Sequence, residues 1–223
     1  MVTETMVGFD ADGTFIDSLP AHMRAINYIL RSFGKKELTV AEFLQRNKDY
    51  RTFYTDLGID VSLDELQKIY RPKFREAVVN LRPPLVENAG ETFCYLIKRG
   101  CRLALITAQQ EETIYFYDSY TSFLTFFRPR IYFAQYPLRK YNILKEIKER
   151  DPDHRKKIYI YVSDTPDDLE DAQRAGWKVY GINKIAFAST ENLKAAIHRG
   201  QGALLQDIIE LKMMFQDEPK KDL

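Results

Sequence analysis

The chain has 223 residues, of which 45% are hydrophobic and 29% are charged, as in an ordinary globular protein of one sizeable domain or two small ones. Its 33 basic and 32 acidic residues give a net charge of +1, which excludes the strongly basic character of a nucleic-acid-binding surface. No apolar run reaches the roughly 20 residues needed to cross a bilayer, and residues 1–5 lack the features of a signal peptide.

A short buried strand is predicted at the start of the chain. Residues 5–9 form an apolar run that leads directly into Asp10 and Asp12, and Gly13 allows the backbone to leave the strand sharply. Open α/β sheets bind their ligands at the carboxyl ends of the strands. Two acids at such a corner repel each other unless a cation or a proton relieves them. The stretch therefore predicts a site of chemistry.

The next segment, residues 18–82, is predicted to be helical throughout. Its apolar residues recur at intervals of three and four over residues 20–33, 40–57 and 63–81. Ser62 and Glu65 have the spacing of a capping box. We therefore expect a helical domain over residues 18–82, inserted into a core domain formed by residues 1–17 and 83–223.

Helices and strands alternate from residue 87 onward. The pattern predicts strands at 102–107, 130–134, 157–163 and 178–182, and helices at 91–98, 111–123, 140–150, 167–175, 191–197 and 204–215. This order predicts an α/β fold with a doubly wound parallel sheet. Cys94 and Cys101 are expected to be buried free thiols in a reducing cytoplasm. Residues 216–223 are interpreted as a frayed charged tail.

Polar residues follow the strand that ends near residue 107. A hydroxyl at Thr107 and the backbone amides at Ala108 and beyond suit a phosphate oxygen. A threonine before a helix is also a common N-cap, which is the alternative interpretation. Lys140 opens a later helix and offers a cation. A solvated lysine is its ordinary alternative, and Arg139 is the competing candidate for the cation.

An acidic cluster follows the strand at 157–163. Asp164 ends that strand and Asp168 lies four residues later, at the start of a helix. Acids favour the first turn of a helix because of its dipole, and that explanation suffices for Asp167, Glu170 and Asp171. For Asp164 and Asp168 we favour a functional interpretation, because both lie at the sheet edge predicted for Asp10.

These four stretches resemble the four motifs of the haloacid dehalogenase superfamily, whose members are mostly magnesium-dependent phosphatases. The first is Asp10-x-Asp12-Gly13-Thr14, and Thr107 and Lys140 match the second and third. The fourth is Ser163-Asp164-x-x-x-Asp168, in which Ser163 replaces the usual glycine, and the common Lys-Pro pair of the third motif is absent. The helical insertion matches a type 1 cap of subfamily I, and residues 17–22 resemble the start of the cap in phosphoglycolate phosphatase-like members.

The resemblance implies a role for each matching residue. Asp10 is the nucleophile, Asp12 the general acid and base, and Thr107 and Lys140 are catalytic. Thr107, Ala108 and Lys140 bind the substrate phosphate. Mg²⁺ is the implied cofactor, with ligands drawn from Asp10, the backbone carbonyl of Asp12, and Asp164. Asp168, placed in the same metal-binding set, orients the metal-bound waters or holds Lys140.

The predicted function is a cytoplasmic Mg²⁺-dependent phosphatase that acts on a small phosphorylated metabolite, phosphoglycolate-like or a sugar phosphate. An acid at position 12 argues against dehalogenation, because a halide leaves without a proton. A β-phosphoglucomutase-like phosphomutase and a non-catalytic binding module of the same fold remain alternatives. We expect no nucleic-acid or membrane partner, and a monomer or homodimer.

Other groups are given ordinary explanations. In the cap, Arg46, Lys48, Tyr50 and Arg51 are candidates for contact with an anionic substrate, but a solvated helix face explains them as well. The aromatic residues between 115 and 127 are expected to pack in the core or to form a self-association surface. His22, His154 and His198 show no metal-ligand spacing.

Overall fold

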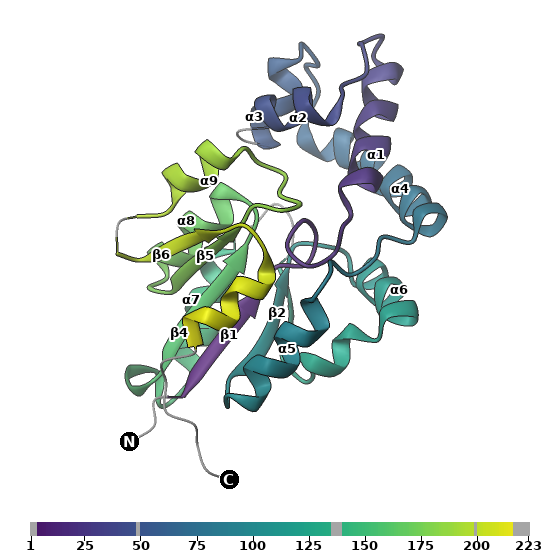
Figure 1. Cartoon of the computed structure of the whole chain (residues 1–223). Coiled ribbons are helices and arrows are strands. Elements are labelled where there is room, and N and C mark those ends of the chain that lie inside the picture. Colours follow the sequence, from purple (N-terminus) through teal and green to yellow (C-terminus); the bar gives the residue numbers. More distant parts are fainter. Residues whose placement is uncertain (1–3, 48–49, 135–139, 199, 216–223) are drawn as a thin grey trace.

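A computed structural model describes residues 4–47, 50–134, 140–198 and 200–215 of the chain. Its strands form one six-stranded sheet in the order β3-β2-β1-β4-β5-β6, and every neighbouring pair is parallel (Figure 1). The strands are β1 (Thr5–Phe9), β2 (Arg102–Thr107), β3 (Ile131–Phe133), β4 (Ile158–Ser163), β5 (Lys178–Ile182) and β6 (Gly202–Leu205). The predicted parallel sheet is confirmed.

The α-helices agree closely with the sequence pattern, apart from the segment around residue 47. They are α1 (Leu19–Ser32), α2 (Val40–Arg46), α3 (Tyr50–Asp56), α4 (Leu63–Leu81), α5 (Ala89–Lys98), α6 (Glu111–Thr121), α7 (Tyr141–Arg150), α8 (Pro166–Arg174) and α9 (Thr190–Ala196). Short 3₁₀ helices lie at Phe123–Phe126, His154–Lys156 and Ile208–Phe215. The capping box at Ser62 and Glu65 forms as expected and sets the start of α4.

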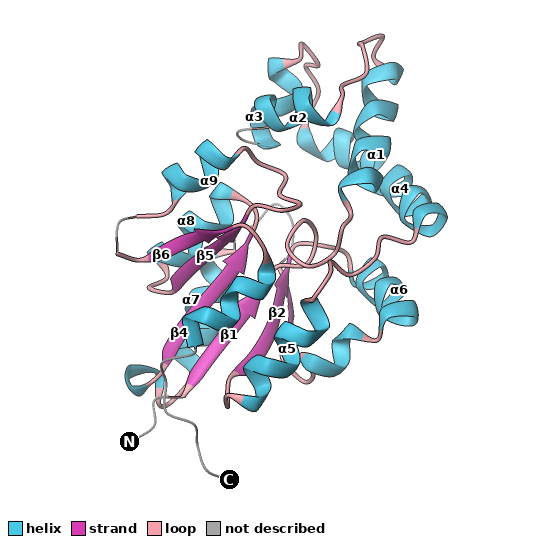
Figure 2. Ribbon diagram, in the orientation of Figure 1, coloured by secondary structure: helices cyan, strands magenta, loops and turns pink. Residues whose placement is uncertain are grey.

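Helices cover both faces of the sheet (Figure 2). On one face, Val7 and Phe9 of β1 pack with buried residues of α5, α6 and the 3₁₀ helix Ile208–Phe215. On the other face, Met6 packs with buried residues of α7, α8 and α9. Successive strand residues point to opposite faces, and because both faces are covered, all five residues of β1 are buried. The doubly wound core is thus present as predicted.

The four helices α1 to α4 stand beyond the carboxyl edge of the sheet (Figure 1). They pack around an apolar cluster of their own, whose buried members include Ile29, Leu30, Phe43 and Phe53. The longest helices, α1 and α4, lie against each other along much of their length. The helical insertion therefore has an apolar cluster of its own, while α1 and α4 also place Ala25, Phe74 and Val78 in the cluster on one face of the sheet.

Two secondary-structure predictions are wrong. Residues 40–57 form two helices, because Asn47 leaves the helical conformation and its side-chain amide donates to the carbonyl of Phe187 at 2.8 Å. Residues 204–215 do not form an α-helix: Gly202–Leu205 pairs with β5, and a 3₁₀ helix follows. A Cβ at Gly202 would lie 1.9 Å from the carbonyl oxygen of Val179, so this close strand pairing requires glycine.

The two cysteines differ in their surroundings. Cys101 is buried as expected, but Cys94 is exposed, because it lies on the outer side of α5. Neither forms a disulfide. Within the ranges described above, no helix combines the length and the apolar character that a membrane span requires. The predicted tail at residues 216–223 lies outside the described residues.

Candidate active site

A tight loop after β1 carries the first pair of acids. The chain turns back at once, because the backbone N–H of Ile16 donates to the carbonyl of Ala11 at 3.0 Å. Gly13 has a φ of +75°, and a Cβ at this position would lie 2.2 Å from Oδ2 of Asp164. Only glycine satisfies both the backbone angle and the close approach. The loop is thereby held against the end of β4, next to Asp10.

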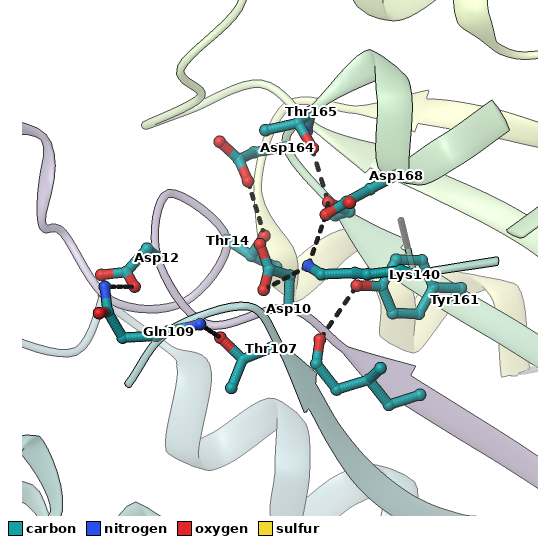
Figure 3. A network of polar contacts seen from close by, with 12 residues as sticks. Asp10, Asp12, Thr14, Thr107, Gln109, Lys140, Tyr161, Asp164, Thr165 and Asp168 are labelled. Carbon is teal, nitrogen blue, oxygen red and sulfur yellow. Dashed lines mark hydrogen bonds and ion pairs between the residues drawn. The ribbon is translucent and has the colours of Figure 1, made fainter. Parts of the chain in front are cut away.

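Three central strands bring polar residues to one point (Figure 3). Asp10 follows β1, Thr107 ends β2, and Asp164 follows β4, and β1 lies between the other two. All three side chains are buried. The chain leaves β1 for β2 on one side and returns to β4 on the other, so this is the switch point of the sheet, where such folds bind ligands.

Lys140 forms ion pairs with two carboxylates at this point. Its Nζ lies 2.7 Å from Oδ1 of Asp10 and 2.6 Å from Oδ2 of Asp168, and Lys140 is only 4% exposed. Burial alone lowers the pKa of Lys140, but the charges of Asp10 and Asp168 outweigh it and hold that pKa well above its ordinary value. Lys140 is therefore a permanent cation beside Asp10.

Two further contacts fix Lys140 and Asp168. The Ser163 hydroxyl donates to Oδ2 of Asp168 at 3.0 Å, a bond that the family's usual glycine cannot make. Asp171 accepts the backbone N–H of Tyr141 at 3.2 Å and so anchors the start of α7, directly after Lys140. The helix dipole alone was expected to explain Asp171, but it is 1% exposed, so it is a buried positioning group. Arg139, the competing cation, lies outside the described residues.

Thr107 and Ala108 line the same site as Asp10 and Lys140. The Thr107 hydroxyl oxygen accepts the backbone N–H of Gln109 at 3.1 Å. This bond satisfies one backbone donor and leaves the hydroxyl hydrogen available to a ligand oxygen. The alternative interpretation of Thr107 as an N-cap is wrong, because Gln110 is the N-cap residue of α6.

Asp12 lies in a separate set of contacts. Its carboxylate accepts hydrogen bonds from Gln109 Nε2 and from the hydroxyl of Tyr117, each at 2.9 Å. Nε2 of His22 lies 3.9 Å from Oδ1 of Asp12. Burial alone raises the pKa of Asp12, but the interactions with His22 and Gln109 lower it below its ordinary value. Asp12 is held away from Lys140, with its own donors.

Sequence reasoning did not identify three residues of this set. All three lie near the Asp12 carboxylate: Gln109 in the loop after β2, Tyr117 on α6 and His22 on α1. Tyr117 is fully buried in the core as expected, and its hydroxyl still reaches Asp12. The sequence does carry a signal for Gln109, since this residue lies two positions after Thr107 at the end of the same strand. Nothing in the spacing of His22 and Tyr117 indicates their contact with Asp12.

Burial and like charges perturb the two acids nearest the sheet edge. Burial raises the pKa of Asp10 to about 6, although the charge of Lys140 acts to lower it. Burial and the charge of Asp10 raise the pKa of Asp164 well above its ordinary value, against a hydrogen bond from the Phe187 N–H. Both carboxyls therefore hold a proton more tightly than an ordinary aspartate does. The site therefore has a deficit of cations.

Mg²⁺ fits this deficit. Among the residues that the structure describes, no three His, Cys, Asp or Glu side chains are grouped as a metal site. Mg²⁺ is typically held by only one or two carboxylates, together with substrate phosphate and water, so a sparse set of oxygens suits it. Asp10 and Asp164 follow the neighbouring strands β1 and β4, and the charge of Asp10 raises the pKa of Asp164. A cation between them would relieve this repulsion, so these two carboxylates are the best placed for the ion.

A cavity of about 340 Å³ joins the sheet edge to the helices α1 to α4. Asp10, Asp12, Thr107, Lys140 and Asp168 line it on the sheet side. Of the predicted cap contacts, Arg46 is exposed and does not line the cavity. Lys48 and the side chains of Tyr50 and Arg51 lie outside the described part of the chain. The cavity is large enough for a small phosphorylated compound.

Comparisons with known proteins identify the same fold. A family model described as haloacid dehalogenase-like hydrolase matches residues 7–182. A haloacid dehalogenase-like hydrolase from Streptococcus pneumoniae is 18% identical, with a TM-score of 0.75 over 97% of this chain and 100% of that one. A predicted phosphoglycolate phosphatase from Haemophilus somnus is also 18% identical, with a TM-score of 0.71 over 97% and 100%.

A candidate β-phosphoglucomutase from Thermotoga maritima is 19% identical, with a TM-score of 0.64 over 97% of this chain and 100% of that one. A comparison with curated protein sequences found no match. The structural similarities establish the fold, a parallel α/β core with an inserted helical cap. The family match covers well over half of the sequence and includes the acids at the end of β1. The chain belongs to the haloacid dehalogenase-like hydrolases.

Proposed function

We propose that this hydrolase is a cytoplasmic Mg²⁺-dependent phosphatase that cleaves a small phosphate monoester through an aspartyl phosphate on Asp10. One observation carries the proposal. Asp10 contacts the buried cation Lys140, at 2.7 Å, whereas Asp12 lies apart among the hydrogen-bond donors Gln109 and Tyr117. A nucleophile beside a cation and a separate acid-base group are what two-step phosphoryl transfer requires.

In the first step, a carboxylate oxygen of Asp10 attacks phosphorus and the bond from phosphorus to the ester oxygen breaks. Asp12, which must carry a proton for this step although His22 and Gln109 lower its pKa in the free protein, gives that proton to the leaving alcohol. Lys140 and the Thr107 hydroxyl bind phosphoryl oxygens and stabilise the charge on them. In the second step, Asp12 takes a proton from water as the water attacks phosphorus. Inorganic phosphate leaves and the Asp10 carboxylate is regenerated.

A bound Mg²⁺ would supply the positive charge that lets an anionic nucleophile approach an anionic phosphate. We propose the carboxylates of Asp10 and Asp164 and the backbone carbonyl of Asp12 as its ligands. Asp168, also in the predicted metal-binding set, is given the role of holding Lys140, because it lies 2.6 Å from Nζ. Each unit-charge pair at about 4 Å is worth roughly 4 kcal/mol at an effective dielectric of about 20, so these charges matter.

Mg²⁺ is expected to stabilise the folded protein. At about 100 times its Kd, binding at one site adds about 2.7 kcal/mol to the free energy of unfolding, which thermal unfolding detects as a higher Tm. The rise in Tm should disappear in Asp164→Asn, because a proposed ligand is lost. Glu170→Gln is the matched control, since Glu170 is exposed on α8 and has the same charge. An equal rise in Asp164→Asn would contradict the assignment of Asp164.

Asp12→Asn is expected to reduce hydrolysis of an alkyl phosphate by about 10²–10⁴-fold, because an alkoxide leaves poorly without a proton. The first step with 4-nitrophenyl phosphate needs no proton donor. This variant should therefore release a burst of about one nitrophenolate per enzyme and then stall. Rapid-quench kinetics would detect the burst. If the rate of the first step falls equally for the alkyl phosphate and for 4-nitrophenyl phosphate, the role of Asp12 as the acid is contradicted.

The proposal is tested by phosphate release from 4-nitrophenyl phosphate and a panel of phosphate monoesters, with and without Mg²⁺. Mg²⁺-dependent release supports the phosphatase. The similarity to a candidate β-phosphoglucomutase makes a phosphomutase the second candidate. A mutase would move the phosphoryl group between positions of a sugar phosphate and release little phosphate. If folded protein that binds Mg²⁺ turns over no ester, both the phosphatase and the phosphomutase are overturned, and a non-catalytic binding module is favoured.

The expected partner is a small phosphorylated metabolite and neither nucleic acid nor membrane, because the chain is almost neutral overall. A monomer or a homodimer is the expected assembly, which light scattering would determine.

A further inference from the structure

The cavity above Asp10 changes from polar to apolar as it extends away from the sheet. At the sheet edge it is lined by charged and polar groups, among them Asp10, Asp12 and Lys140. The wall that α1, α2, α3 and α4 contribute is mainly hydrocarbon and aromatic, including Ile26, Phe43, Phe53, Leu63, Leu66 and Phe74. Phe187, from the loop before α9, adds a further ring beside this wall, where it packs edge-on against the His22 ring with centroids 4.4 Å apart.

Several polar side chains in this outer part have partners within the protein, whereas the buried Nε2 of His22 has no hydrogen-bond partner among the described residues. The Asn47 amide donates to the Phe187 carbonyl at 2.8 Å, and Oε1 of Gln67 accepts from Nε of Arg71 at 3.1 Å. The His22 ring lies against Phe74, with ring centroids 4.2 Å apart. Hydroxyl groups of a sugar would thus lie mostly against carbon, and a polar group buried without a partner is costly.

The geometry of the reaction directs the leaving group toward this wall. In-line displacement places the ester oxygen opposite the attacking oxygen of Asp10, with Asp12 beside it as the proton donor. Asp10, Asp12 and the apolar residues line one continuous cavity. An apolar cavity of about 150 Å³ can hold a benzene molecule. The volume of about 340 Å³ is therefore enough for a phosphoryl group and one group of that size.

We infer that the substrate is the phosphate monoester of an alcohol that carries one compact apolar group, such as an aromatic ring, and not phosphoglycolate or a sugar phosphate. This inference rests on the proposed phosphatase and narrows its substrate class. The apolar group lies against the surface formed by the α1–α4 wall and Phe187, and the phosphoryl group lies at Lys140 and Thr107. Removal of the apolar surface from water supplies the selectivity.

The test compares three esters with similar primary leaving groups: 2-phenylethyl phosphate, glycerol 3-phosphate and glucose 6-phosphate. Because the bond that breaks is nearly the same in each, differences in kcat/KM report contacts with the rest of the molecule. We expect kcat/KM for 2-phenylethyl phosphate to exceed both others by about tenfold or more. Equal values, or a preference for either polar ester, would overturn the inference.

A pair of variants locates the selectivity. Leu63→Asn places an amide in the cavity wall at the first turn of α4, and should lower the preference for 2-phenylethyl phosphate by about tenfold. Val79→Asn is the control, because Val79 is 48% exposed on the same helix and does not line the cavity. An unchanged preference in a folded Leu63→Asn protein would overturn the assignment of the wall.

Binding to the Asp10→Asn protein separates this inference from the proposed function. With Mg²⁺ present, calorimetry should show tighter binding of 2-phenylethyl phosphate than of glycerol 3-phosphate, whether or not the wild type turns either over. If no ester is hydrolysed but this order holds, the phosphatase proposal fails and the assignment of the apolar pocket stands. If esters are hydrolysed but the order is reversed, the phosphatase stands and the substrate class is wrong. The variant keeps the pocket intact.

Discussion

Asp10→Asn is expected to lower Mg²⁺-dependent phosphate release by about 10⁵-fold or more, the scale of loss when a covalent nucleophile is removed. A carboxamide oxygen is a poor nucleophile and carries no charge for a cation. The substitution preserves the shape of the side chain, so the fold is expected to survive. Steady-state release from 4-nitrophenyl phosphate measures the loss. Acid-quenched wild-type protein should carry one phosphoryl group on Asp10, by mass spectrometry, and the variant none.

The matched control is Asp153→Asn, which removes an exposed carboxylate before β4, at the opposite end of that strand from Asp164. Its turnover should stay close to that of the wild type, because surface substitutions away from the site change little. Wild-type turnover in Asp10→Asn, or a phosphoryl group on another residue, would show that the nucleophile lies elsewhere.

Lys140→Met is expected to destabilise the Mg²⁺-free protein by about 3–5 kcal/mol near neutral pH and to reduce turnover strongly. The substitution leaves the buried carboxylates of Asp10 and Asp168 without their shared cation, and breaking a buried ion pair costs that much. Urea unfolding measures the stability. Lys145→Met, on the exposed face of α7, is the control, since its pair with Glu149 contributes only about 0.5 kcal/mol.

The loss should depend on pH. Asp10 has a pKa of about 6 even beside Lys140, and removing that charge raises this pKa further. A folded-state pKa above the unfolded value of about 3.9 means that the folded variant binds the proton more tightly. The variant therefore becomes more stable as the pH falls from about 7.5 to 5.5, and its deficit relative to the wild type shrinks. A deficit that is constant over this range would contradict an unpaired Asp10 carboxylate as its cause.

Local sequence signals were sufficient for most of the fold. The capping box at Ser62 fixed the start of α4, and the residues predicted for α4, β2 and β5 agree with the observed ones. Apart from the exposed Ile158, all residues of β1 and β4 are buried, so both runs are mostly apolar and easy to recognise. Asp10 and Asp164 were identifiable because each directly follows such a run.

The errors arose where contacts distant in sequence decide the structure. Gly202–Leu205 has little intrinsic strand preference, and its pairing with β5 makes it a strand. Asn47 interrupts a helical pattern, and its amide contacts the carbonyl of Phe187, 140 residues away. Tyr117 looks like any core aromatic, and only the fold places its hydroxyl 2.9 Å from Asp12.

Phe43 and Leu66 of the outer wall pack in the apolar cluster of the inserted helices and not in the cluster beneath Asp10, so mutation and selection can act on the outer wall and on the phosphate site independently. Substitutions at separated sites with no shared partners add in their effects on stability. Substitutions at residues such as Phe43 or Leu66 can therefore reshape the outer wall while the packing beneath Asp10 is preserved. Descendants of such a protein can acquire new leaving-group preferences through a few changes in one helical segment, with the phosphate chemistry inherited intact.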